Sequence, residues 1–520
     1  MELGSSLCFD DVLMEPLYSS IESRSSISLE INIATNGRRL VLKTPLISSP
    51  MDTVSETEMA IKMALSGGLG IIHRYMSIDD EVLQVIKVKR FLQYIIENPY
   101  RVYPDTTLEE IENYINQYNV STYCVVKSEN DSTLIGILTR RDIENMRYHL
   151  GGENGFVYNN VLPQLASEMK VADFMSIPSI SIESSTEELQ SKPEMLLKLA
   201  KEFMMINKCE KIPIVHKNVL IGLITLKNIK HWENNKSKAC IDISGALCVG
   251  AAIGIIDDYK ERLNALVNAG VDLICVDVAN GFNSNVISTV KEIRALYPKL
   301  PLMVGNVCNW QGYEALASLD IDCIRVGVGN GSICTTRLET GIGKGQFSAV
   351  AECFRYKTIN YKLPNIICDG GSLGKTGNKV KALACGSVAI MLGRTLASTE
   401  ESPGQIIFRN GKKFKYIRGM ASTMANLSKQ EKTLTISGEN SLKRKLKTNF
   451  TAEGVDGEQE LTGSVVDLIE QINGGLKSGL SYLGCINIEQ LHQKNIKNEI
   501  KFNIVSTIGM TETGIRVKTY

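Results

Sequence analysis

The sequence predicts an α/β protein built on a (β/α)₈ TIM barrel that is interrupted by an inserted domain. Between residues 240 and 400, short apolar runs such as 323–327 alternate with segments of helical length. Such runs are typical of fully buried parallel strands, and their alternation with helices indicates βαβ units. Several runs end in or just before polar residues, including Asp277, Asn306 and Asp369. Because barrel active sites lie at the carboxyl ends of the strands, a closed barrel fits better than an open sheet.

Residues 90–235 break the barrel pattern and predict the inserted domain. The stretch 136–143 recurs approximately as 222–229, and each copy follows a predicted helix and an apolar strand. An internal repeat of this kind indicates two copies of one structural unit. We therefore expect the first part of the barrel over residues 1–89, and the remainder of the barrel with the C-terminal segment over 236–520.

Composition limits the class of protein. Lysine plus arginine and aspartate plus glutamate each number 57 in the 520 residues, so the formal net charge is zero. This balance gives no electrostatic reason to expect nucleic acid as a partner. No apolar run reaches the roughly 20 residues of a membrane-spanning helix, and no signal peptide opens the chain. We therefore expect a cytoplasmic protein without a membrane partner.

Among 13 cysteines, Cys334 is the candidate nucleophile. The odd number and the lack of any Cys-x-x-Cys pair indicate neither a disulfide framework nor a zinc site, so no metal-ligand cluster is expected. Cys334 differs from the others because its loop is rich in glycine and follows a predicted strand. Such a loop brings backbone N–H groups close to a phosphate, and a serine adds a hydroxyl donor. The loop residues concerned are Gly327, Gly329, Gly331 and Ser332.

Two further loops, residues 369–372 and 392–394, follow consecutive predicted strands. Barrel enzymes commonly bind phosphate with the loops after their last strands. Together with the cysteine loop, these two predict a phosphorylated ligand. Asp369 would bind the ribose hydroxyls of that ligand, and its alternative role is to cap a helix.

Four motifs carry a resemblance to a known family. They are Phe9-Asp-Asp-Val-Leu13, Ser48-Ser-Pro-Met-Asp-Thr-Val54, Gly331-Ser-Ile-Cys-Thr-Thr-Arg337 and Tyr416-Ile-Arg-Gly-Met-Ala-Ser422. On these residues the chain resembles the IMP dehydrogenase/GMP reductase family over nearly its whole length. It is most similar to GMP reductases that carry cystathionine-β-synthase-type (CBS) domains. The resemblance implies an oxidoreductase of purine metabolism with a purine mononucleotide substrate, assembled as a homotetramer or octamer.

The resemblance implies covalent chemistry at Cys334. Its thiolate would add to C2 of the purine, with Thr336 and Glu453 as general acid and base; from the residues alone, Glu453 would be a solvated loop carboxylate. The implied substrate contacts are Ser49, Met51, Arg325, Ser332, Asp369, Gly371, Gly393, Arg394, Gly419, Met420 and Ala421. The implied cofactor contacts are Asp277, Asn280, Gly281, Asn306 and Gly327. A monovalent cation near Gly329, Gly331 and Cys334 is also allowed.

The strand-end segment 277–281 has a simpler alternative interpretation as a strand-to-helix turn containing Asn-Gly. The inserted repeat resembles a tandem of CBS domains, in which a Thr-x-x-Asp holds ribose hydroxyls. The first copy has Thr139 and Asp142, whereas the second pairs Thr225 with an asparagine, Asn228. The resemblance implies a regulatory purine nucleotide there, and the alternative is a purely structural appendage.

Sequence differences within these motifs and segments bear on which of the family's two reactions the protein catalyses. The segment 426–450 lacks the Arg-Tyr pair with which the dehydrogenase activates water. Three other segments resemble the reductase sequence: 277–281, 23–26 and 515–517. Three features are commoner in dehydrogenases: the inserted domain and the sequences Pro-Met-Asp-Thr-Val and Arg-Gly-Met. Three positions depart from the family pattern: Arg74, Gly345 and Ile417.

We therefore predict NADPH-dependent reduction of GMP to IMP and ammonia. The alternative is an IMP dehydrogenase that makes XMP with NAD and a potassium ion. A second alternative is a purine-nucleotide sensor that has lost catalysis.

Overall fold

The structure is a computed structural model of the chain. The residues it describes are 4–92, 95–96, 99–118, 120–151, 169–177, 181–185, 193–256, 258–358, 363–371, 373–422, 425, 451–506 and 509. The chain divides into two compact units. The barrel unit comprises Met1–Phe91, Lys236–Asp242 and Ala246–Tyr520, and the inserted unit comprises Leu92–Asn235 and Ile243–Gly245.

The barrel unit is built on an eight-stranded parallel sheet with the order β4-β18-β17-β16-β15-β14-β13-β5. A parallel bridge between Ile47 and Leu69 joins the two end strands, so the predicted TIM barrel is confirmed. The strands are almost wholly buried, as their apolar runs predict. Their bounds are β4 Leu46–Ser48, β5 Gly70–Ile72, β13 Val249–Ile253, β14 Leu273–Asp277, β15 Leu302–Val307, β16 Cys323–Val326, β17 Asn365–Asp369 and β18 Ala389–Leu392.

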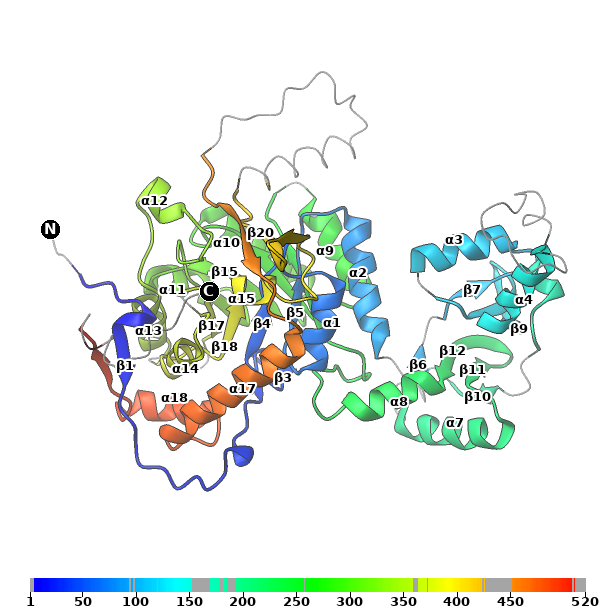
Figure 1. The fold of residues 1–520 in the computed structure, drawn as a ribbon, viewed down its shortest axis with the longest axis horizontal. Coiled ribbons are helices and arrows are strands. Elements are labelled where there is room, and N and C mark those ends of the chain that lie inside the picture. The colour runs from blue at the N-terminus through cyan, green and yellow to red at the C-terminus, as the bar shows by residue number, and fades with distance from the viewer. Residues whose placement is uncertain are drawn as a thin grey trace, which may run out of the picture. The chain divides into compact units, whose positions relative to one another are not determined.

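Helices surround these strands (Figure 1). Polar residues cap several of them; for example, the Asn283 and Asn309 side chains accept backbone N–H bonds in the first turns of α10 and α11. The C-terminal helices α17 and α18 pack against α14. The helix bounds are α1 Thr57–Leu65, α2 Ile78–Phe91, α9 Tyr259–Asn268, α10 Ser284–Leu296, α11 Trp310–Ala317, α12 Thr336–Thr340, α13 Gln346–Lys357, α14 Thr376–Ala384, α15 Arg394–Ala397, α17 Val465–Tyr482 and α18 Ile488–Ile496.

Three small sheets complete the barrel unit. An antiparallel sheet of β19 (Ile406–Arg409), β20 (Lys412–Arg418) and β21 (Asp456–Glu460) follows β18 in sequence. The pairing of β20 with β21 sets residues 451–455 beside 416–422. The other two sheets pair β1 (Val12–Met14) with β22 (Phe502–Ile504), and β2 (Ile31–Asn32) with β3 (Val41–Leu42).

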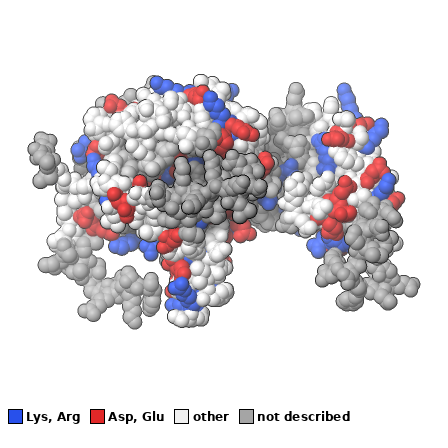
Figure 2. All heavy atoms as spheres, turned by 90° about the horizontal axis from the view of Figure 1, so that it is seen from above, with Lys and Arg blue, Asp and Glu red and all other residues white. Residues whose placement is uncertain are grey.

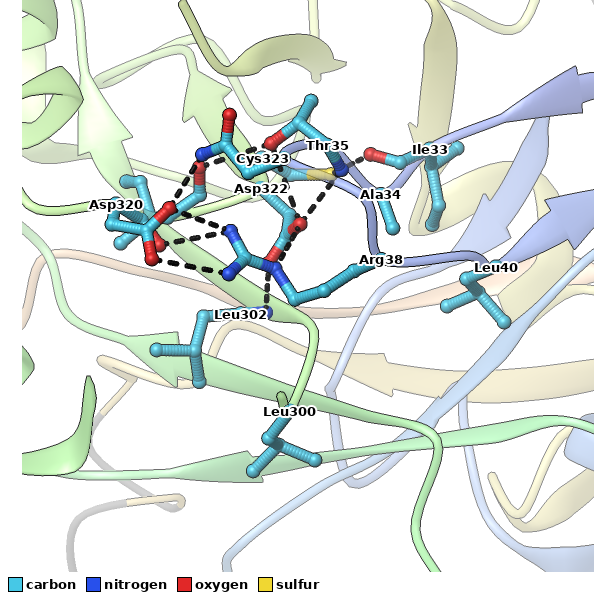
Figure 3. Close-up of polar contacts among 12 residues, drawn as sticks. Ile33, Ala34, Thr35, Arg38, Leu40, Leu300, Leu302, Asp320, Asp322 and Cys323 are labelled. Carbon is cyan, nitrogen blue, oxygen red and sulfur yellow. Dashed lines mark hydrogen bonds and ion pairs between the residues drawn. The ribbon is translucent and has the colours of Figure 1, made fainter. Parts of the chain in front are cut away.

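The loop between β2 and β3 closes the amino end of the barrel. Its apolar residues Ile33 and Leu40 pack with inward-facing strand residues in one buried cluster. Its polar residues reach Asp322, which is fully buried directly before β16. The Asp322 carboxylate accepts the Thr35 N–H at 2.7 Å and the Arg38 Nε–H at 2.8 Å (Figure 3). We call Thr35, Arg38, Arg294, Asp320 and Asp322 the floor cluster.

In the inserted unit, both copies of the repeat fold as helix, strand, strand, helix. The first copy contains α3 Leu108–Tyr118, β8 Tyr123–Ser128, β9 Asp131–Leu138 and α4 Arg140–Gly151. The second contains α7 Pro193–Asn207, β11 Lys211–His216, β12 Val219–Thr225 and α8 Leu226–Asn235. The sheet order is β10-β11-β12-β9-β8-β7, with β6 paired to β12. These short strands are β6 Ile95–Ile96, β7 Arg101–Val102 and β10 Ile182–Glu183.

Charged side chains of both signs intermingle on the described surface seen in Figure 2, in keeping with the zero formal net charge. Among the described helices, none has both the length and the apolar character that crossing a membrane requires.

Candidate active site

A cavity of about 400 Å³ opens at the carboxyl ends of the barrel strands. Its wall combines residues from the ends of β4, β5, β14, β15, β16 and β17 with two further segments, 419–421 and 453–454. This is the end of a barrel where active sites lie. The predicted residues that line it are Ser49, Met51, Asp277, Asn306, Arg325, Gly327, Gly329, Gly331, Cys334, Thr336, Asp369, Gly419, Met420, Ala421 and Glu453.

Cys334 begins a short chain of hydrogen bonds. Its Sγ lies 3.2 Å from Oγ1 of Thr336, and that hydroxyl lies 2.7 Å from Oε2 of Glu453. The thiol can donate to the hydroxyl, which in turn donates to the carboxylate. A proton can therefore pass from sulfur to carboxylate through a hydroxyl that is neither consumed nor ionised.

Backbone pairing holds Glu453 in this place. Cys334 and Gly454 form an antiparallel bridge, and the Thr335 N–H donates to the Glu453 carbonyl at 2.8 Å. Gly419 fits tightly against this pairing, because a Cβ there would lie 3.1 Å from the Ile333 carbonyl oxygen. The cysteine loop, the turn after β20 and the segment before β21 therefore form one packed wall.

Arg325 lies between two carboxylates in the cavity. Its Nη1 donates to Oδ1 of Asp277 at 2.5 Å, and its Nη2 donates to Oδ2 of Asp369 at 2.8 Å. Asn306 also donates to Oδ2 of Asp369, at 2.8 Å. Burial opposes the charged guanidinium, but Asp369 and Asp277 outweigh it and hold the pKa of Arg325 above its ordinary value.

The loop after β4 is tied to the turn after β20. Nε of Arg418 donates to the Asp52 carboxylate at 2.8 Å, and the Asp52 N–H approaches the Met420 sulfur at 3.4 Å. The segment that contains Ser49 and Met51 therefore lies beside the 419–421 turn, and both segments line the cavity.

Comparisons with known proteins agree with this geometry. Residues 6–516 match the IMP dehydrogenase/GMP reductase domain family. The chain belongs to the IMP dehydrogenase/GMP reductase family. The predicted resemblance is thus confirmed, and the protein is an oxidoreductase of a family that uses a nicotinamide cofactor.

The similar proteins include both IMP dehydrogenases and a GMP reductase. Inosine-5'-monophosphate dehydrogenases from Nitrosopumilus maritimus and Bacillus subtilis are 38% and 37% identical to the chain, over 95% and 98% of its length. The chain covers 95% and 94% of those two proteins. A solved GMP reductase variant from Trypanosoma brucei, in complex with guanosine 5'-monophosphate, matches with a TM-score of 0.82 at 32% identity, over 99% of this chain and 98% of that one.

Six residues predicted from the family resemblance do not line the cavity. Ser332 and Arg394 are exposed, and Arg394 bonds Gln459 instead. Asn280 accepts the Phe282 N–H within its own turn. The remaining three lie in the described loops around the cavity wall: Gly281, Gly371 and Gly393.

Asp369 is not a helix cap, because α14 begins only at Thr376. Its contacts with Arg325 and Asn306 make it part of the cavity wall instead. Ser372, the last residue of that loop, and residues 426–450 and 515–517 lie outside the described residues.

The cavity residues that sequence reasoning missed include Arg74 and Tyr75, which follow β5. The Arg74 guanidinium lies 4.9 Å from the centre of the Tyr75 ring, which is within cation–π range. The available signal was their place directly after a barrel strand. Arg74 was noted only as a departure from the family's usual lysine.

The cavity fits the nucleotide groups that the family implies. Asp277 and Asp369 each keep one carboxylate oxygen without a hydrogen-bond partner among the described residues, and ribose hydroxyls are natural donors to such oxygens. The monovalent cation fits less well. The Gly331 carbonyl already accepts the Cys334 N–H, and the Arg337 side chain packs against Gly329. Arg337 brings its own positive charge to this loop, which disfavours a second cation there.

In the inserted unit, the predicted ligand residues act as helix caps. The Asp142 carboxylate accepts both the Thr139 hydroxyl at 2.6 Å and the Thr139 N–H at 2.8 Å, directly before α4. In the second copy, the Thr225 hydroxyl accepts the Asn228 N–H at 3.1 Å, directly before α8. Both motifs thus have a local structural role, whether or not they bind a ligand.

Proposed function

We propose that the protein is a GMP reductase, which converts GMP and NADPH to IMP, NADP⁺ and ammonia. The observation that carries this proposal is the hydrogen-bonded chain from Cys334 through Thr336 to Glu453. This chain provides the nucleophile and a proton carrier for deamination. The sequence 426–450 supplies no Arg-Tyr pair for the water activation that a dehydrogenase needs.

The first half of the reaction breaks the bond between C2 and the amino group. Thr336 relays the thiol proton to Glu453, and the Cys334 sulfur forms a bond to C2 of GMP. The proton held at Oε2 of Glu453 then returns through the Thr336 hydroxyl to the amino nitrogen. Ammonia leaves with the electron pair of the C2–N bond, and the purine remains attached to sulfur.

The second half releases the thiol. Bound NADPH would supply a hydride to C2. The electron pair of the C2–S bond then returns to the Cys334 sulfur, which takes a proton from solvent, and IMP leaves. Asp369 would hold the substrate ribose, because Arg325 and Asn306 occupy its Oδ2 and leave Oδ1 to accept hydroxyls. Backbone N–H groups of the glycine loops would bind the phosphate.

The test follows the absorbance of the reduced nicotinamide. Mixing the protein with GMP and NADPH should lower this absorbance, and GMP with NADH should lower it less. A rise in absorbance with IMP and NAD, and none of the first change, would overturn the proposal in favour of the dehydrogenase.

IMP dehydrogenase is the second candidate, because curated relatives of that name match 95% and 98% of the chain. Failure of both reactions, together with tight purine-nucleotide binding, would instead identify a sensor without catalysis.

We further propose that the inserted unit is a CBS pair that binds a regulatory purine nucleotide, within a tetramer or octamer. A GMP reductase from Trypanosoma brucei solved with guanosine 5'-triphosphate supports this, with a TM-score of 0.72 at 28% identity, over 97% of this chain and 98% of that one. Titration calorimetry with GTP and ATP, on wild type and on Thr139→Val, should show weaker binding in the variant. Equal binding would place the nucleotide elsewhere.

A further inference from the structure

Four neighbouring strands each bring one polar side chain to the centre of the cavity. Asp277 ends β14, Asn306 lies on β15, Arg325 lies on β16 and Asp369 ends β17. Arg325 is 5% exposed, and it alone in this group contacts carboxylates from strands on both sides.

Both carboxylates accept a hydrogen bond from the same guanidinium, and Asp369 accepts a further one from Asn306. The Arg325 fork is planar and rigid, so its two nitrogens cannot move independently of each other. Its Nε has no hydrogen-bond partner among the described residues, and its other contact is a weak one, 3.6 Å from Nη1 to the Cys275 sulfur. Any shift of one carboxylate will therefore turn the guanidinium and disturb the other.

The two carboxylates face different ligands if the protein is a GMP reductase. Asp369 would bind the substrate ribose and Asp277 the nicotinamide ribose, and each has one oxygen available for this. We infer that Arg325 is a positioning residue that couples binding of the purine nucleotide to binding of the nicotinamide cofactor. This inference rests on the proposed function for the identity of the two ligands.

Thermodynamic linkage makes the coupling reciprocal. Removing the Asp277 carboxylate should weaken GMP binding, although Asp277 would not contact GMP. Removing the Asp369 carboxylate should likewise raise KM for NADPH at saturating GMP. Both cross-effects should disappear once Arg325 no longer joins the two residues.

The experiment measures GMP binding by titration calorimetry in the Cys334→Ala background, where no adduct forms. Asp277→Asn should raise the Kd for GMP at least about fivefold, the lower end of ordinary coupling. In the Arg325→Gln background, the same Asp277→Asn change should alter Kd less than about twofold. Arg325→Lys should also lose the coupling, since a single ammonium cannot hold two carboxylates in a fixed geometry.

Asp320→Asn is the matched control. Asp320 also pairs with an arginine, Arg38, at 2.9 Å, but at the closed end of the barrel and away from the cavity. It should change neither the Kd for GMP nor the KM for NADPH, and thermal melting will establish that every variant is folded.

An unchanged Kd for GMP in Asp277→Asn overturns the coupling through Arg325. So does a cross-effect of equal size in the Arg325→Gln background. Failure of the proposed function has a different signature: wild type would turn over IMP with NAD rather than GMP with NADPH. The same variants would then be titrated with IMP, and the coupling would stand or fall on that result.

Discussion

The two ends of the barrel use the same pair of residue types for different purposes. At the floor, Arg38 contacts Asp320 and Asp322; at the mouth, Arg325 contacts Asp277 and Asp369. Both arginines are nearly buried and both bridge two carboxylates. The two ends differ in how many carboxylate oxygens the protein itself occupies.

The floor leaves no oxygen of Asp322 without a partner. Oδ1 accepts the Thr35 N–H and Arg38, and Oδ2 accepts the Leu302 N–H at 2.9 Å (Figure 3). Oδ2 also accepts a hydrogen bond from Arg294 at 3.3 Å. At the mouth, Asp277 and Asp369 each keep an oxygen without a partner among the described residues. A fully satisfied carboxylate stabilises the fold, whereas a half-satisfied one beside a cavity is available to a ligand.

The largest effect is expected at the mouth, for Cys334→Ala. Turnover should fall by at least about 10³-fold, because no other thiol lines the cavity wall that the structure describes. The Kd for GMP and the melting temperature should stay close to wild type. Cys308→Ala, which removes a half-buried thiol that does not line the cavity, is the control and should keep normal activity.

At the floor, Asp322→Asn should lower the free energy of unfolding by about 3 kcal/mol, because the arginines lose a buried charged partner. Urea unfolding would measure this. The KM for GMP should be unchanged in protein that remains folded. Asp369→Asn should behave in the opposite way, with weaker GMP binding and a smaller loss of stability. If the two variants behaved alike, the contrast between floor and mouth would be refuted.

Glu453→Gln should slow the deamination step by about 10²-fold, because an amide cannot take the proton that Thr336 relays. Hydride transfer should be affected less. Rapid mixing that follows ammonia release and NADPH oxidation separately would measure the two steps. Glu458→Gln, a change on β21 where the carboxylate pairs with Arg409 at 2.9 Å, is the control. Equal slowing of both steps would contradict the assigned role of Glu453.

The smallest effect concerns how the contribution of the floor to the free energy of unfolding depends on pH. Hydrogen bonds from Arg38 hold the pKa of Asp320 below its ordinary value, against a smaller opposing effect of burial. The ionised carboxylate therefore stabilises the folded state above pH 3.8, and this stability is lost as the pH falls through the lower folded pKa. Because Asp320 is half-exposed, the effect should be below about 1 kcal/mol.

Urea unfolding of wild type and Asp320→Asn between pH 3 and 5 would measure this difference. The variant should show the shallower fall in stability toward acid. An identical pH dependence would show that Asp320 contributes nothing to the floor.

The barrel could be predicted from the sequence because each strand is a local apolar run with a polar end. Cys334 and Thr336 could be paired for the same reason, since they are only two residues apart. Glu453 lies 117 residues from Thr336, so only the family resemblance could bring it to the site. Its geometry depends on backbone pairing of distant loops, which leaves no periodic pattern in the sequence.

The family resemblance implies a site role for Arg325, but the partners of the two bridging arginines could not be foreseen. Arg325 is 48 residues from Asp277 and 44 from Asp369, and Arg38 is 284 from Asp322. No local pattern in the sequence links these charged side chains to one another. Their partners are determined by barrel closure, which only the structure shows.

The position of strand β16 bears on how this protein can tolerate substitutions during evolution. Asp322 lies directly before the strand and Arg325 lies within it, so about 10 Å of one short strand separates the ion pairs of the floor from those of the mouth. We therefore expect substitutions that remodel the mouth to leave the closed end intact. This arrangement favours evolvability, because two reactions as different as oxidation of IMP and reduction of GMP can be inherited on one unaltered frame.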